Sequence, residues 1–134
     1  EMSASLVGSE MCIRDRNLMQ NLCIAYQDIL KKHKLYATST TGQMIEDVAN
    51  LKIHKLLAGH FGGMQQMGSK ISNNEIDLLI FLQDPANKKR TPDFYNVLNL
   101  CDQYNIPCAT NLPTAEVLIL ALDRGDLDWR NMYK

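Results

Sequence analysis

The sequence lacks the surplus of positive charge that nucleic acids and anionic membranes attract. Its 134 residues include 14 lysine and arginine residues against 15 aspartate and glutamate residues, for a formal net charge of −1. Because phosphate-rich partners favour proteins with a clear basic excess, we predict no nucleic acid and no membrane as partner. Apolar runs such as Leu78 to Leu82 are also far shorter than the roughly 20 residues of a membrane helix. With 46% apolar residues, the chain is expected to form one soluble domain with a real core.

Closely spaced cysteines are missing as well. Cys12, Cys23, Cys101 and Cys108 are scattered, and no two of them have the spacing of a zinc or redox motif. Scattered cysteines of this kind are usually buried free thiols in a reducing compartment. We therefore predict a cytoplasmic protein without a metal, and two disulfides are the alternative.

Residues 1–16 show no clear period, and they lack the basic start and apolar stretch of a signal peptide. They read EMSASLVGSEMCIRDR and resemble translated adaptor sequence of the kind found at the ends of environmental gene fragments. We interpret this stretch as non-native and expect the functional domain to span residues 17–134. The alternative is a divergent first strand with Ser5 to Gly8 as its core.

From Asn17 onward, segments of helical period alternate with short apolar segments. Helices are expected at 17–33, 44–49, 64–71, 92–104 and 113–122, and strands at 35–38, 53–58, 76–82 and 107–110. The alternation predicts an α/β fold, a single doubly wound domain with a parallel sheet and helices on both faces. In such folds ligands bind at the carboxyl ends of the strands. The loops at that edge are expected to be 39–42, 59–64, 84–93 and 111–114.

Three hydroxyls follow the first of these strands, in the run Thr38-Ser39-Thr40-Thr41-Gly42. Between a strand and a helix start, hydroxyls and unpaired backbone N–H groups favour an anion such as phosphate. The alternative is plain helix capping by Thr40 or Thr41.

A glycine-rich segment, Gly59 to Gln66, follows the next strand. Glycines let the backbone approach a ligand closely, and His60 could reach that ligand. The alternative is a loop that needs unusual backbone dihedrals for structural reasons alone.

Two carboxylates and a basic run lie at the third loop. Asp84 ends the most apolar strand, so its side chain is expected at the ligand edge, and Asp93 falls in the first turn of a helix, where a carboxylate is also favourable for structural reasons. Thr91 and Pro92 form a natural helix start. Lys88-Lys89-Arg90 is either a solvated face or the source of one ligand contact.

Taken together, these segments resemble the methylglyoxal synthase family. Four ordered motifs carry the likeness: L-Y-A-T-S-T-T-G at 35–42, G-H-F-G-G-M-Q-Q at 59–66, I-D-L-L-I-F-L-Q-D-P at 76–85, and N-I-P-C-A-T-N with T-A-E at 105–111 and 114–116. The likeness covers residue 17 to the C-terminus. It implies a homohexamer that eliminates inorganic phosphate from dihydroxyacetone phosphate to give methylglyoxal, with no metal or organic cofactor.

The resemblance also implies roles for individual residues. Phosphate would be held by Thr38, Ser39, Thr40, Thr41, Gly59 and Arg90. Asp84 and Asp93 would be the catalytic carboxylates, and Asn111 and Thr114 would line the rim.

The sequence departs from the family at its catalytic base. The aspartate of the family's G-G-D-Q-Q motif is Met64 here, and a thioether accepts no proton at neutral pH. Ala58 replaces a serine, Arg90 aligns with the family's histidine, and the first strand with its A-H-D-x-x-K motif is absent. Two hypotheses follow: a methylglyoxal synthase that is impaired, and a catalytically silent phosphate-binding homologue. An unrelated α/β domain is a third, weaker alternative.

Overall fold

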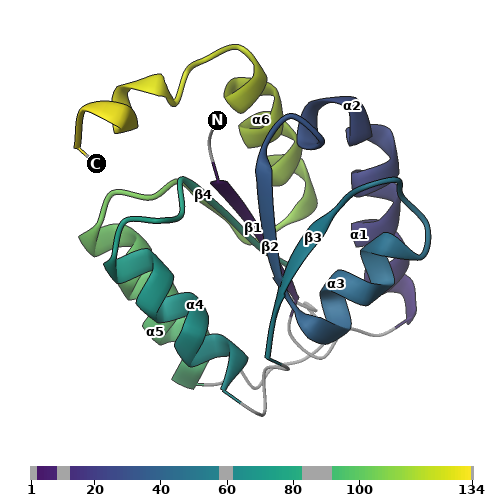
Figure 1. The fold of residues 1–134 in the computed structure, drawn as a ribbon, viewed down its shortest axis with the longest axis horizontal. Coiled ribbons are helices and arrows are strands. Elements are labelled where there is room, and N and C mark those ends of the chain that lie inside the picture. Colours follow the sequence, from purple (N-terminus) through teal and green to yellow (C-terminus); the bar gives the residue numbers. More distant parts are fainter. Residues whose placement is uncertain (1–2, 9–12, 58–61, 83–91, 134) are drawn as a thin grey trace.

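The computed structural model describes residues 3–8, 13–57, 62–82 and 92–133. Within them, a five-stranded sheet has the strand order β3-β2-β1-β4-β5, and all neighbouring strands are parallel (Figure 1). The strands are β1 (Ser3–Gly8), β2 (Lys34–Thr38), β3 (Ile53–Leu56), β4 (Leu78–Leu82) and β5 (Cys108–Ala109). The helices are α1 (Ile13–Ala25), α2 (Gln27–Leu30), α3 (Ser39–Glu46), α4 (Gly63–Ser72), α5 (Pro92–Gln103), α6 (Leu112–Asp123) and the 3₁₀-helix η2 (Asp128–Tyr133).

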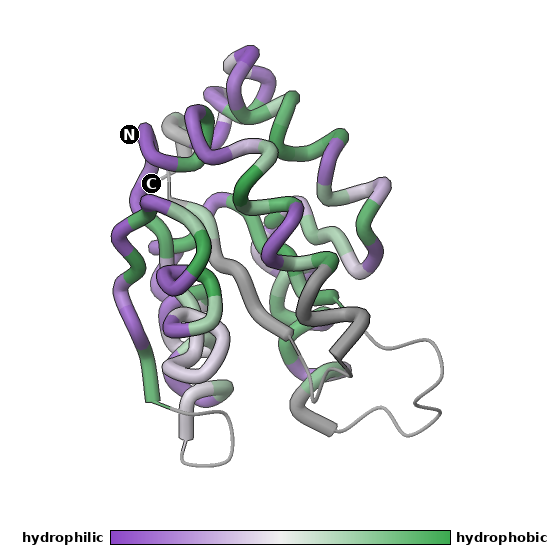
Figure 2. The backbone as a smooth tube through the Cα atoms, turned by 90° about the vertical axis from the view of Figure 1, so that its right-hand side faces the viewer, coloured by the Kyte–Doolittle hydropathy of each residue, from purple (hydrophilic) through white to green (hydrophobic). Residues whose placement is uncertain are grey.

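Helices cover both faces of the sheet, so the predicted doubly wound α/β fold is confirmed. Helices α1, α2, α3 and α6 pack on one face, and α4 and α5 pack on the other (Figure 1). Along the helices that face the viewer in Figure 2, hydrophobic and hydrophilic residues are interspersed, as expected for helices with one buried side.

Strand β4 shows how the sequence pattern produces these two cores. All five of its residues are buried. Leu78, Ile80 and Leu82 join the core under α1, α3 and α6, whereas Leu79 and Phe81 join the core under α4 and α5. Side chains alternate between the two faces of a strand, so a strand covered on both faces must be apolar throughout.

The central strand is formed by residues from the segment that we interpret as non-native. Strand β1 pairs with β2 on one side and β4 on the other, with Ala4 opposite Leu35 and Leu78. Ala4 is also buried in the core. The expectation that a first strand is absent is therefore wrong for the structure, and a strand around Ser5 to Gly8 is present. The non-native origin of residues 1–16 stays a prediction.

Two other local expectations need correction. The helix expected over 17–33 begins earlier, at Ile13, and breaks at Tyr26, whose φ of −110° and ψ of 22° are not helical. Residues 39–42, which the sequence pattern predicts as a loop, form the first turn of α3. Thr38, the last residue of β2, is extended, and the next residue, Ser39, is already helical. The chain therefore passes from strand to helix without a loop.

The C-terminal η2 was not expected from the sequence. It lies against the start of β4, where the side chain of Arg130 is buried and contacts Asp77. Among the described residues, no helix has the length and apolar character needed to cross a membrane.

Candidate active site

The threonine-rich segment lies at the carboxyl edge of the sheet, where β2 passes directly into α3. Thr38 is the N-cap of α3, with φ of −62° and ψ of 156°, and its side chain makes no capping hydrogen bond. Thr38 and Thr41 are both buried, and their hydroxyl oxygens lie 3.5 Å apart. Ser39 is half-buried and Thr40 is exposed. The alternative in which Thr40 or Thr41 caps the helix is wrong, since the cap position is held by Thr38.

This arrangement can hold an anion. The first N–H groups of a helix have no partner within the helix, and the helix dipole places partial positive charge beside them. Because the N-cap side chain does not bind these N–H groups, they are available to a ligand. Phosphate at such a helix start would add charge-assisted hydrogen bonds from the nearby hydroxyls.

Gly42 has a packing role that the motif alone does not reveal. A Cβ at this position would lie 2.9 Å from Cγ of Lys55 and 3.2 Å from Cγ2 of Ile53. The missing side chain therefore allows α3 to lie close against β3. The same contact is reinforced by Glu46, which forms an ion pair with Lys55 and accepts a hydrogen bond from the N–H of Ile53 at 3.1 Å. The Lys55 hydrogen bond, followed by that of Ile53, holds the pKa of Glu46 below its ordinary value.

The family's base position lies at the start of α4. Gly62 is the N-cap of that helix with φ of +101°, a left-handed conformation that favours glycine, and Met64 follows in the first turn. Met64 is half-buried and packs against the core beneath α4 and α5. It also lines a cavity of about 360 Å³ between these two helices.

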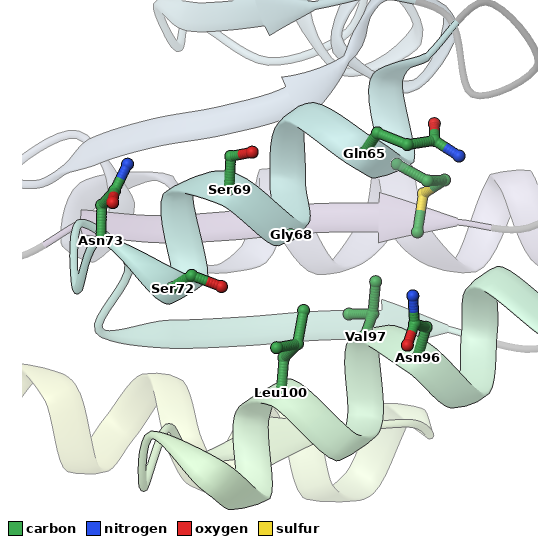
Figure 3. A pocket seen from close by; sticks show the side chains of 9 residues that line it. Gln65, Gly68, Ser69, Ser72, Asn73, Asn96, Val97 and Leu100 are labelled. Atoms are coloured by element: carbon green, nitrogen blue, oxygen red, sulfur yellow. The ribbon is translucent and has the colours of Figure 1, made fainter.

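That cavity is a polar groove without ionisable side chains. Besides Met64 and Val97, the lining includes the amides of Gln65, Asn73 and Asn96 and the hydroxyls of Ser69 and Ser72. Side chains from the two helices face each other across it (Figure 3). Its residues can donate and accept hydrogen bonds, but none of them can serve as a general base at neutral pH.

The side chain of Gln66 connects the start of α4 to the residue that follows β3. Its Oε1 accepts a hydrogen bond from the N–H of Leu57 at 2.7 Å. This bond brings the end of β3 against the first turn of α4, on either side of residues 58–61. Local sequence patterns do not indicate this contact, because it joins a backbone group to a side chain nine residues away.

Asn111 and Thr114 form the start of α6. Asn111 is the N-cap, and its Oδ1 accepts hydrogen bonds from the N–H of Thr114 at 3.0 Å and from its hydroxyl at 2.8 Å. Both residues are exposed at the same edge of the sheet as Thr38. Their capping bonds explain the presence of these residue types, and a role at the rim stays a prediction.

Several predicted site residues lie outside the described residues: Gly59, His60, Asp84 and Arg90. Asp93 lies in the first turn of α5, with only its backbone described. The topology brings the starts of α3, α4, α5 and α6 to one edge of the sheet, and Figure 1 shows the starts of α3, α4 and α5 toward the bottom of the view. Thr38, Met64 and Asp93 therefore share the edge at which doubly wound proteins bind ligands.

Comparison with known proteins agrees with this arrangement. The family model of the MGS-like domain matches residues 19–110. The chain is 52% identical over 132 residues to methylglyoxal synthase of Caldicellulosiruptor saccharolyticus, covering 98% of this chain and 92% of that protein. It is 50% identical over 134 residues to methylglyoxal synthase of Clostridioides difficile, covering 99% and 96%.

The fold is also that of a solved relative. The crystal structure of methylglyoxal synthase from Elizabethkingia anophelis superimposes with a TM-score of 0.78 at 28% identity, covering 89% of this chain and 77% of that one. The family resemblance that the four sequence motifs indicate is confirmed by the sequence comparisons and by the structural comparison. The chain belongs to the methylglyoxal synthase family.

Proposed function

We propose that this chain acts as a methylglyoxal synthase, eliminating inorganic phosphate from dihydroxyacetone phosphate to give methylglyoxal. The observation that supports the proposal most directly is the cradle at the start of α3, where Thr38 and Thr41 approach each other beside the first N–H groups of the helix. The chain also shares 52% and 50% of the aligned residues with two proteins that carry this name.

The substrate's phosphate would bind in that cradle. The N–H groups at the start of α3 and the hydroxyls of Thr38, Ser39, Thr40 and Thr41 suit its oxygens. Gly59 and Arg90 would complete the phosphate contacts, as the family resemblance implies. No metal or organic cofactor enters this proposal.

The reaction then begins with proton removal. A carboxylate takes a proton from the carbon next to the carbonyl, and hydrogen-bond donors stabilise the enediolate that forms. The electron pair of the enediolate expels phosphate from the neighbouring carbon, the C–O bond breaks, and the remaining enol tautomerises to methylglyoxal. Asp84 and Asp93 are the candidates for the base.

Met64 lowers the expected rate. Its thioether accepts no proton, so one of the two remaining carboxylates must act from a less favourable position. Loss of a general base commonly reduces a rate by about 10²–10⁴-fold. The same residue favours the second candidate function, a phosphate-binding homologue without activity.

A rate assay with matched variants tests the proposal. The purified 134-residue chain is mixed with dihydroxyacetone phosphate, and methylglyoxal formation is followed over time. Met64→Asp is expected to raise the rate, whereas Met64→Asn, of similar size but without a carboxylate, is not. Thr40→Ala should weaken phosphate binding in either case.

The outcomes separate the two candidates. Activity in the wild type, enhanced by Met64→Asp alone, supports the synthase. Phosphate binding with no activity in any variant supports the silent homologue. Absence of both activity and phosphate binding would contradict both.

Assembly and location belong to the same proposal. Family resemblance implies a homohexamer in the cytoplasm. Sedimentation analysis of the purified chain tests the assembly, because a hexamer and a monomer of 15.2 kDa differ sixfold in mass.

A further inference from the structure

The groove between α4 and α5 has an apolar floor and a polar rim. The floor consists of the less exposed lining residues, of which Val97 is buried and the others are half-buried: Met64, Gly68, Val97 and Leu100. Five exposed polar side chains form the rim: Gln65, Ser69, Ser72, Asn73 and Asn96. The three lining side chains of α5 point toward α4 (Figure 3).

The spacing of the lining residues explains why they share one groove. On α4 they form two rows with a spacing of four residues, at 64, 68 and 72 and at 65, 69 and 73, and residues four apart lie on the same face of a helix. Gly68 keeps the two helices close at the floor, because a Cβ there would lie 3.3 Å from Cδ1 of Leu100. The two helices therefore form a narrow trough with polar side chains along its edges.

The chemistry of the lining disfavours charged and aromatic ligands. None of the described residues that line the groove is charged or aromatic. A phosphate or carboxylate would find no cation there, and a nucleobase would find no ring on which to stack. Lys70 of α4 does not line the groove, since its Nζ lies 4.6 Å from the centroid of the Tyr36 ring.

The rim has hydrogen-bonding capacity to offer. Amide side chains carry both donors and acceptors, and serine hydroxyls can act as either. No hydrogen bond joins the five rim side chains to another residue in the described part of the chain. Ligand hydroxyl groups, which also donate and accept, are the natural match for such a rim.

We propose that this groove binds an uncharged polyhydroxy compound of about monosaccharide size, such as a hexose or a polyol. The rim would bind its hydroxyl groups, and the apolar floor would pack against its C–H groups. The groove volume of about 360 Å³ lies in the lower part of the range of small-molecule sites, about 300–1,000 Å³. The groove and the α3 cradle lie on opposite faces of the sheet (Figure 1). The proposal therefore does not depend on synthase activity.

Saturation-transfer NMR titration of the purified 134-residue chain tests the proposal, with D-glucose, D-fructose and glycerol as probes. Gln65→Leu with Asn96→Leu removes two rim amides and should weaken sugar binding about tenfold. Asn99→Leu with Gln103→Leu is the matched control, because it makes the same changes at exposed positions of α5 outside the groove. The control pair should bind as the wild type does. Absence of binding by all three probes, or equal weakening by the two pairs, would overturn the proposal.

Hydrogen exchange with mass spectrometry then locates the sugar. Binding in the groove should protect residues 64–73 and 96–100, whereas binding in the α3 cradle would protect residues 38–42. Protection confined to residues 38–42 would refute the groove site. Sedimentation analysis of the two variant pairs tests whether the groove is instead covered by a second copy of the chain. A change in assembly mass with the groove pair alone, without sugar binding to the wild type, would replace the proposal with an interface.

Discussion

Arg130 and Asp77 form a buried ion pair between the C-terminal helix η2 and the start of β4. Nε of Arg130 donates to Oδ1 of Asp77 at 3.2 Å, and the two side chains are 3% and 0% exposed. The guanidinium also donates to Oδ1 of Asn74 at 2.9 Å and to the carbonyl oxygens of Ile76, Tyr104 and Asn105. A single side chain thus joins η2 to the two turns that lead into β4 and β5.

Removing one partner of this pair should destabilise the fold strongly. Arg130→Met leaves the Asp77 carboxylate buried without its cation, and a change of this kind costs about 3–5 kcal/mol of unfolding free energy. Urea denaturation at pH 7 measures the loss. The double variant Arg130→Met with Asp77→Leu removes both charges and should recover much of it. A single variant that unfolds at the wild-type urea concentration would show that the ion pair contributes little.

Gly42→Ala should destabilise the contact between α3 and β3. The added methyl group meets Lys55 at 2.9 Å and Ile53 at 3.2 Å. The lysine can rotate away but the isoleucine is buried, so we expect a loss of about 1–2 kcal/mol. Gly68→Ala is the matched control, because its closest neighbour is the flexible Cδ1 of Leu100 at 3.3 Å. Thermal unfolding of both variants measures the difference, and an equal effect would contradict the close approach at Gly42.

Cys108 should be the most reactive of the three cysteines that the structure describes. A hydrogen bond from the thiol of Cys101 lowers the pKa of Cys108, and the same bond, together with burial, raises the pKa of Cys101. Burial alone raises the pKa of Cys23 to about 12. Because the thiolate is the nucleophile, alkylation near pH 8 should modify Cys108 first. Peptide mapping by mass spectrometry measures the order. Cys101→Ala should slow the reaction of Cys108, and an unchanged rate would exclude the hydrogen bond as its cause.

Glu46 should make stability depend on pH in the acidic range. The Lys55 ammonium and the Ile53 N–H lower its pKa from the ordinary value of 4.5 in the folded state. A lowered carboxyl pKa stabilises the fold above 4.5, and this stabilisation is lost as the pH falls through the folded-state value. Glu46→Gln should therefore lower the urea midpoint at pH 7 more than at pH 3. Asp47→Asn, at an exposed neighbouring position, serves as the control. A Glu46→Gln effect that is the same at both pH values would contradict this account.

Much of the fold could be predicted from local sequence patterns. The apolar run that contains Leu78 to Leu82 was expected as a strand covered on both faces, and the structure buries every residue of β4. Pro92 was expected to start a helix, and it is the first residue of α5. Both signals act over a few residues, through side-chain alternation and proline's fixed φ, so tertiary contacts do not need to be known.

Other features could not be read from local pattern. The helix expected over residues 17–33 breaks at Tyr26, and the segment that was expected to contribute no strand forms the centre of the sheet. The position of β1 depends on pairing with β2 and β4, which come from distant parts of the sequence. Residues with a weak pattern can form a strand when two neighbours supply all of its hydrogen-bond partners.

The sequence by itself determined the alternation of strands and helices and the threonine-rich segment at the start of α3, because both depend on short-range periodicity and helix-start chemistry. The tertiary structure alone decided that Asp77 pairs with Arg130 from 53 residues away, and that Gly42 allows α3 to approach β3. Those relationships arise from strand order and packing, and a linear pattern carries no information about which distant residues meet.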